Sequence, residues 1–120
     1  MNPRQILVVD DEWGIGEAIV FLLMRDGYQA RYAPNGLVAL EMLAREPVDM
    51  VLTDLMMPIV DGSELLRKMR TMDDLASMPV VVMSAVPENI ARTACPLATA
   101  FLRKPFPSAL LLDEVRKILG

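Results

Sequence analysis

The sequence contains no histidine, one cysteine and one tryptophan among 120 residues. Without histidine the usual zinc sites cannot form, and no histidine within the chain can act as a general base or carry a phosphoryl group. The single cysteine, Cys95, excludes an internal disulfide and fits a reducing compartment. Any chemistry that requires histidine must therefore be supplied by another molecule.

Long apolar runs and basic clusters are also missing. The longest helical apolar stretch, residues 18–24, is too short to span a bilayer, and the apolar run near the N-terminus is too short for a signal peptide. The formal charge of −4, without a basic run, argues against direct nucleic-acid binding by this domain. We therefore expect a cytoplasmic protein with no membrane contact.

What the chain does have is apolar sequence, since 53% of its residues are hydrophobic. A chain of this length and composition can bury a core without disulfides or a structural metal. No linker, repeat or low-complexity tract divides it. We predict that residues 1–120 form one domain, with no output domain in this chain.

Five short apolar segments are predicted as strands, and a helical pattern follows each of them. Such alternation implies parallel strands joined by right-handed crossovers, with helices on both faces of the sheet. The first helix is apolar nearly all round, so we expect two of its sides to pack rather than to leave an exposed docking patch. The third helix is expected to pack Leu65, Leu66, Met69 and Met72 on one side. The expected strands are residues 5–9, 28–33, 50–53, 80–83 and 100–102; the first four helices begin near residues 15, 37, 62 and 87, and the last has Leu111, Leu112, Val115, Ile118 and Leu119 on its apolar face.

Polar residues follow four of the predicted strands. Asp10 and Asp11 follow the first, Asp54 ends the third, Ser84 follows the fourth and Lys104 comes after the fifth. The Asp54 strand has no polar alternation, which is typical of a central parallel strand buried on both faces. Because ligands bind at the carboxyl ends of such strands, we expect these side chains to converge. Each one alone is an ordinary capping or loop residue.

Taken together and in order, these segments resemble the receiver domains of bacterial two-component response regulators over the whole chain. The resemblance implies a single doubly wound (βα)5 domain of the α/β class: a flavodoxin-like five-stranded parallel sheet with strand order 2-1-3-4-5. The motifs that carry it are Val8–Glu12, Asn35-Gly36 with Ala39-Leu40, Asp54–Pro58 with Asp61-Gly62, Ser84-Ala85 and Phe101–Phe106.

The resemblance makes Asp54 the phosphoacceptor, which takes a phosphoryl group from a histidine kinase or a histidine phosphotransfer protein. The acceptor and the phosphoryl group are both anionic, so a divalent cation, Mg²⁺ or Mn²⁺, is expected between them. Asp11 and Asp54 would bind it directly, Asp10 mainly through water, and Met56 through its backbone carbonyl.

The same resemblance assigns the phosphoryl oxygens to Ser84, the backbone amide of Ala85 and Lys104. Lys104 would pair with Asp54 when no phosphoryl group is present. Ser84 and Phe101 would form the switch, with plain core packing as the alternative for Phe101. The Lys104-Pro105 bond is expected to be cis, as is usual in this family.

The expected function is a phosphorylation-dependent signalling switch rather than an enzyme. Its partners would be the phosphoryl donor, docking in part on Phe21 and Met24, and a downstream effector protein or output domain. A weak or phosphorylation-dependent homodimer is the third expected contact. Pro87 and Pro96 shorten the fourth helix, which argues against ordinary dimerisation through that face.

Two alternatives stay open at this point. One is a pseudo-receiver that binds proteins without control by phosphorylation. The other is a Mg²⁺-dependent phosphohydrolase with an aspartyl nucleophile, which often places a second acid two residues after the first; here that position is Met56. Many receiver domains carry a polar residue at this position that can orient attacking water, so Met56 also predicts slow autodephosphorylation.

Overall fold

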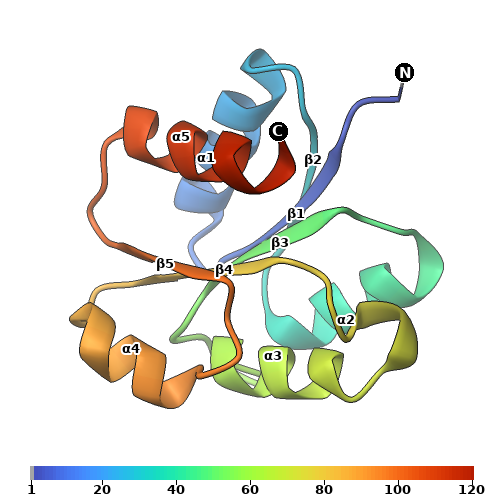
Figure 1. Ribbon diagram of the computed structural model, residues 1–120, viewed down its shortest axis with the longest axis vertical. Helices are drawn as coiled ribbons and strands as arrows, with labels where there is room; N and C mark the ends of the chain where they lie inside the picture. Colours follow the sequence, from blue (N-terminus) through green and yellow to red (C-terminus); the bar gives the residue numbers. More distant parts are fainter. Residues whose placement is uncertain (1) are drawn as a thin grey trace.

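A computed structural model describes residues 2–120 of the protein. Its five strands are all parallel and form one sheet in the order β2-β1-β3-β4-β5 (Figure 1). The predicted fold class and strand order are therefore confirmed. The strands are β1 (Gln5–Val9), β2 (Gln29–Ala33), β3 (Met50–Asp54), β4 (Val80–Ser84) and β5 (Ala100–Arg103); the α-helices are α1 (Trp13–Arg25), α2 (Gly36–Arg45), α3 (Gly62–Arg70), α4 (Glu88–Ala94) and α5 (Ser108–Leu119).

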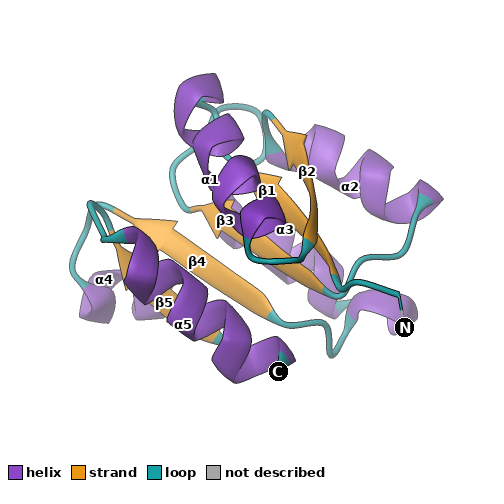
Figure 2. Cartoon of the chain, turned by 90° about the horizontal axis from the view of Figure 1, so that it is seen from above, coloured by secondary structure: helices purple, strands orange, loops and turns teal. Residues whose placement is uncertain are grey.

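The helices cover both faces of the sheet. Helices α1 and α5 lie on one face, and α2, α3 and α4 lie on the other (Figures 1 and 2). The two cores divide the strand side chains by alternation: Leu7 and Val9 face one core, whereas Ile6 and Val8 face the other. Strands β3 and β4 are buried along their whole length, as continuous apolar runs predict.

Side-chain caps fix where two of the helices begin. The Asn35 carboxamide oxygen accepts a hydrogen bond from the Val38 amide at 2.9 Å, at the start of α2. The Asp61 carboxylate accepts one from the Glu64 amide at 2.9 Å, at the start of α3. Each cap satisfies a backbone donor that the first helical turn leaves free. Asp61, the residue of the second cap, is the last residue of the loop between β3 and α3.

Helix α3 is shorter than the apolar pattern predicted. It ends at Arg70, so Met72 is exposed instead of lying on its packed side, and a 3₁₀ turn, η1 (Asp73–Leu75), follows. The Arg70 guanidinium donates to the carbonyls of Leu75 and Met78 at 3.2 and 2.8 Å, and also to the carbonyl of Leu97. These bonds join the α3–β4 connection to the α4–β5 connection, and sequence periodicity cannot anticipate them.

Helix α1 also differs from expectation. Its buried residues include Ile19 and Leu23, but Phe21 is 61% exposed and Met24 is 50% exposed. The prediction that two sides of this apolar helix pack is therefore wrong for these two side chains. Within residues 2–120 no helix combines the length and apolarity needed to cross a membrane.

Candidate functional site

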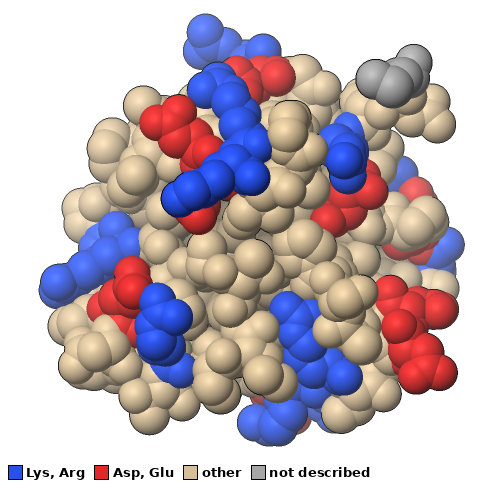
Figure 3. Space-filling model, viewed as in Figure 1, with Lys and Arg blue, Asp and Glu red and all other residues tan. Residues whose placement is uncertain are grey.

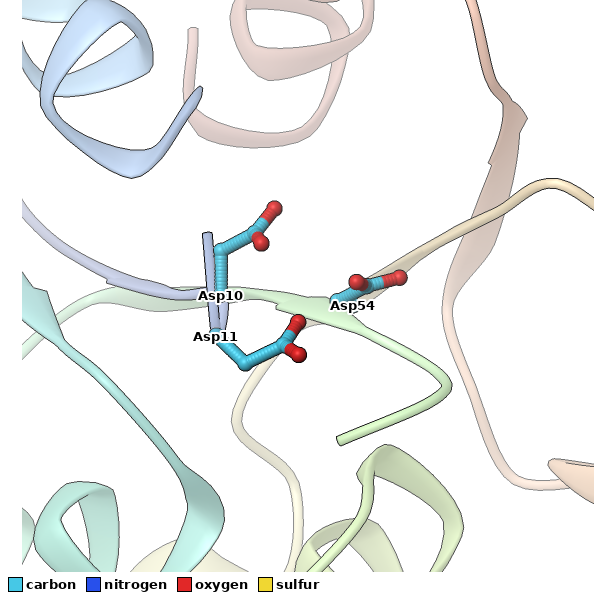
Figure 4. A group of neighbouring side chains, drawn as sticks. All are labelled: Asp10, Asp11 and Asp54. Carbon is cyan, nitrogen blue, oxygen red and sulfur yellow. The ribbon is translucent and has the colours of Figure 1, made fainter. Parts of the chain in front are cut away.

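The carboxylates of Asp10, Asp11 and Asp54 meet at the carboxyl end of the sheet. Strands β1 and β3 are neighbours, and their register pairs Val9 with Thr53. The next residue on each strand is therefore one of the acids, and their side chains extend into the same space (Figure 4). One oxygen from each lies within 4.8 Å of the others. The predicted convergence of the three acids is observed.

Such closeness is unfavourable without a counter-charge. Two carboxylates about 4 Å apart repel by about 4 kcal/mol at an effective dielectric constant of 20. Only 12% of the Asp54 side chain is exposed. Burial raises the pKa of Asp54; the Asp10 carboxylate raises it further, and the Lys104 ammonium and the Leu55 amide oppose the rise.

The counter-charge comes from Lys104, on the loop after β5. Its ammonium lies 3.0 Å from the buried carboxylate of Asp10 and 3.4 Å from that of Asp54. Lys104 therefore does pair with Asp54, but its shorter contact is with Asp10, which the sequence did not indicate. Burial lowers the pKa of Lys104, but its hydrogen bond to Asp10 and the Asp54 charge outweigh that effect and leave the pKa raised.

Asp10 is held in place from three directions. Besides Lys104, its carboxylate accepts a hydrogen bond from the Glu12 amide at 2.9 Å. Its backbone carbonyl accepts one from the Tyr32 hydroxyl at 2.6 Å, on the neighbouring strand β2. Both carboxylate oxygens of Asp10 are thus hydrogen-bonded inside the protein. Asp11, in contrast, is exposed.

The loop after Asp54 is packed tightly beneath the Asp54 carboxylate. The Leu55 amide donates to the Asp54 carboxylate and also to the Met83 carbonyl, both at 2.9 Å. The Gly62 amide donates to the Leu55 carbonyl at 2.8 Å. A Cβ on Gly62 would lie 2.3 Å from the Asp54 carbonyl oxygen, so only glycine fits there.

One residue of this loop is strained. Ile59 has φ 73°, a left-handed conformation that β-branched residues rarely adopt. Its side chain is 71% exposed, whereas its neighbour Val60 is buried and accepts a hydrogen bond from the Gly36 amide. The buried contacts on either side therefore impose the turn, and Ile59 gains no burial from it. The Met56 side chain in the same loop is 70% exposed.

The remaining predicted site residues lie on β4, β5 and their loops. The Ser84 hydroxyl, at the end of β4, accepts a hydrogen bond from the Val86 amide at 3.0 Å. Phe101 is partly buried and packs against the core on the α4 side. Ala85 follows Ser84 and is exposed. The Lys104-Pro105 bond is cis, which confirms that prediction.

A groove between α1 and the β5–α5 loop is a feature that the sequence reading missed. It has a volume of about 360 Å³ and a mostly apolar lining. Apolar helical positions that look like core in a sequence can equally line an open groove, so no local signal distinguishes the two. Phe21 and Met24 do not line it. The lining residues are Gly14, Ile15, Ala18, Ile19, Leu22, Lys104, Pro105, Phe106, Ser108 and Leu111.

The fold and the site define a parallel α/β domain with an acidic pocket at the carboxyl end of its sheet. A family described as "Response regulator receiver domain" matches residues 6–116. The chain belongs to this family, and it is a receiver domain of two-component signalling. Receiver domains are phosphoacceptor switches and in general not enzymes.

Individual relatives agree with this assignment. Sporulation initiation phosphotransferase F of Bacillus subtilis (strain 168) is 35% identical over 121 residues, which cover 99% of this chain and 96% of that protein. Response regulator MprA of Mycobacterium leprae (strain TN) is 37% identical over 116 residues, which cover 96% of this chain and 50% of that protein. This chain therefore matches nearly all of the first relative and half of the second.

A solved structure extends the comparison to the site. The receiver domain of sensor histidine kinase PA1611 from Pseudomonas aeruginosa PAO1 has a TM-score of 0.90 to this chain, with 25% sequence identity and 99% of each chain covered. That protein has a magnesium ion coordinated in its active site cleft. In this chain the acidic pocket lies at the ends of β1 and β3.

Proposed function

We propose that Asp54 accepts a phosphoryl group from a phosphohistidine on a partner protein, and that the domain changes its surface in response. The observation that carries this proposal is the arrangement of Asp10, Asp11, Asp54 and Lys104 at one end of the sheet. This chain has no histidine, so the donor is another molecule, a histidine kinase or a histidine phosphotransfer protein.

In the transfer, a carboxylate oxygen of Asp54 forms a bond to phosphorus as the bond from phosphorus to the donor's imidazole nitrogen breaks. The electron pair of the broken bond stays on that nitrogen, which takes a proton from water. The reaction depends on positioning and on charge stabilisation more than on covalent chemistry by other groups. The fixed loop beneath Asp54 provides the positioning.

The pocket fits a divalent cation. Carboxylate oxygens are ligands that Mg²⁺ and Mn²⁺ prefer, and the surplus of negative charge around Lys104 favours a further cation. Asp11 and Asp54 would hold it directly, Asp10 through water, and Met56 through its backbone carbonyl. When bound, the cation offsets the repulsion between the acceptor and the incoming phosphoryl oxygens.

Three further groups would bind the phosphoryl oxygens. Lys104 reaches the pocket already and needs only to exchange its contact with Asp54 for one with the phosphoryl group. The Ser84 hydroxyl and the Ala85 amide lie on the loop after β4, and Ser84 would leave the Val86 amide to donate its proton to a phosphoryl oxygen. This movement, followed by Phe101, is the proposed switch.

The donor would dock across α1 beside the pocket. The apolar groove between α1 and the β5–α5 loop includes Lys104, so a partner helix seated there would hold its histidine near Asp54. Phe21 and Met24 offer additional exposed apolar area on α1. Downstream, the switched surface would control an effector protein or output domain; a phosphorylation-dependent homodimer is a further proposed outcome.

Intact mass measured after incubation with acetyl phosphate tests the proposed function. We expect a gain of one phosphoryl group that requires Mg²⁺, is lost in Asp54→Asn and persists in Asp113→Asn, an exposed acid on α5. No gain in a folded, Mg²⁺-binding protein would favour the pseudo-receiver instead. Steady turnover of a phosphate ester such as p-nitrophenyl phosphate would favour the phosphohydrolase.

A further inference from the structure

The side chain of Arg92, on α4, lies over the ring of Phe101, on the edge strand β5. Its guanidinium carbon is 4.8 Å from the ring centroid, a distance at which a cation is attracted to the aromatic face. Glu88, one turn earlier on α4, accepts a hydrogen bond from the same guanidinium at 2.5 Å. Acidic and basic atoms lie beside each other over α4 (Figure 3). Arg92 thus connects the fourth helix to the aromatic side chain of the proposed switch.

The space behind Phe101 is too small for its ring. A cavity of about 10 Å³ lies between Phe101 and Ser84, and its lining includes Val86, Glu88 and Ala91. This is the volume of about one water molecule. The ring can move inward only if the loop from Ser84 to Pro87 moves as well. Arg92 is not among the residues that line this cavity, so a ring that moved into it would leave its place beneath the guanidinium.

From this geometry we infer that Arg92 is a positioning residue that holds Phe101 in the partly buried position seen in this structure, here named the outward position, and thereby opposes phosphoryl binding at Asp54. The inference rests on the proposed switching of Ser84 and Phe101. A contact that exists only in the outward state stabilises that state, and it lowers the apparent affinity of any ligand that binds the inward state. Removing the contact between Arg92 and Phe101 must therefore strengthen the binding of a phosphoryl group or its mimic at Asp54.

The size of the effect follows from the contact. A cation over an aromatic ring at an exposed site is worth about a two- to fivefold change in an equilibrium constant. If the outward state predominates in the free protein, the whole change is seen in the ligand affinity. The ion pair with Glu88 lies within α4 and is exposed, so its own loss would have little effect.

The test is the Mg²⁺-dependent affinity for beryllofluoride, a mimic of the phosphoryl group on a carboxylate, measured by calorimetry. We expect Arg92→Met to bind about two- to fivefold more tightly than the wild type. Arg92→Lys, which keeps a cation over the ring, should restore most of the wild-type affinity. Arg45→Met is the matched control, because Arg45 forms an ion pair of the same spacing with Glu41 on α2. It should bind as the wild type does.

A double mutant separates this mechanism from a general loosening of α4. In a Phe101→Leu background, which has no aromatic ring to hold, Arg92→Met should no longer change the affinity. Equal tightening in both backgrounds, or no tightening in the first, would overturn the inference while leaving Asp54 as the acceptor. If the wild type binds no beryllofluoride and gains no mass from acetyl phosphate, the proposed function fails, and the inference fails with it.

Discussion

The two loops that flank Asp54, one after β3 and one after β4, are built in opposite ways. The β3–α3 loop, residues 55–61, buries Leu55, Met57 and Val60 and is tied to β4 and α2 by backbone hydrogen bonds. The β4–α4 loop, residues 85–87, exposes Ala85 and leads into a helix of only seven residues. The first loop holds the Asp54 carboxylate in place, whereas the second has no buried residue and leaves more room for the elements that the proposed switch would move. A switch needs both, because a mobile acceptor would lose its geometry and a rigid responder could not signal.

The largest effect is expected at Gly62, where the fixed loop has no spare room. Gly62→Ala should destabilise the fold by about 3 kcal/mol or more, because the new Cβ would meet backbone atoms of Asp54 and Leu55 that cannot turn aside. Gly14→Ala is the control: nothing lies within 4 Å of its Cβ position, so the helix should gain roughly 0.5–1 kcal/mol. Urea unfolding measures both. Similar values for the two variants would contradict the tight packing of the loop.

The next largest effect concerns the clustered carboxylates of Asp10, Asp11 and Asp54. Mg²⁺ at about a hundred times its dissociation constant should stabilise the wild type by roughly 2–3 kcal/mol. Without metal, Asp54→Asn should be more stable than the wild type at neutral pH by on the order of 1 kcal/mol, because it removes one of three clustered carboxylates. Thermal unfolding with and without Mg²⁺ measures both effects.

The pH dependence of that second difference has a definite sign. The pKa of Asp54 is raised in the folded state above 3.8, the ordinary pKa of an aspartate in an unfolded chain. The folded protein therefore binds this proton more tightly than the unfolded chain does. Above the raised pKa, the ionised Asp54 carboxylate destabilises the fold. As the pH falls through that pKa, the carboxylate becomes protonated and this destabilisation disappears. The advantage of Asp54→Asn should therefore shrink below that pKa. An advantage that grows on acidification would contradict the raised pKa.

A smaller gain is expected at Ile59. Ile59→Gly should stabilise the protein by roughly 1 kcal/mol, because relief of the left-handed strain exceeds the extra flexibility of glycine in the unfolded chain. Ile90→Gly is a suitable contrast, since this isoleucine is also exposed but lies within α4. It should lose stability. A loss at both positions would show that the loop does not strain Ile59.

Met56 offers a kinetic comparison on the same loop. Met56→Asn should hasten loss of the phosphoryl group by about fivefold, because a carboxamide can hydrogen-bond to an attacking water and a thioether cannot. Phosphorylated protein followed by intact mass gives the half-life. Met56→Leu, which adds no polar group, should leave it unchanged. An unchanged half-life in Met56→Asn would count against the predicted slow autodephosphorylation of the wild type.

The subtlest effect is expected at the end of α4. Cys95, at the end of α4, is buried, and burial raises the pKa of its thiol to about 11. If the thiol reacts only when α4 opens, its labelling rate should level off near pH 9, the ordinary thiol value. A rate that continues to rise toward pH 11 would show reaction in place, and α4 would then be as fixed as the β3–α3 loop. Labelling by iodoacetamide between pH 8 and 10 decides between the two.

The sequence predicts the strands and the clustered acids well because both have local causes. The short, β-branched run from Val80 to Met83 favours a buried strand, and parallel strands bring their final residues to one edge. What it could not predict depends on distances between elements. The preference of Lys104 for Asp10, the contact of Arg92 with Phe101 and the left-handed Ile59 each require the packed fold. Met72 was misplaced because an apolar period continues in the sequence after the helix has ended.

The hydrogen bond from Lys104 to Asp10 joins residues 94 positions apart. During synthesis the N-terminus of the chain emerges first, so Asp10 and Asp11, which follow β1, and then Asp54 leave the ribosome long before Lys104. Until β5 pairs with β4, the growing domain holds the clustered carboxylates of Asp10, Asp11 and Asp54 without the lysine that balances them. The negative charge of the acidic pocket is therefore balanced only late in synthesis, when Lys104 reaches it. A nascent chain stalled before residue 104 should depend on Mg²⁺ for its stability more than the finished protein does.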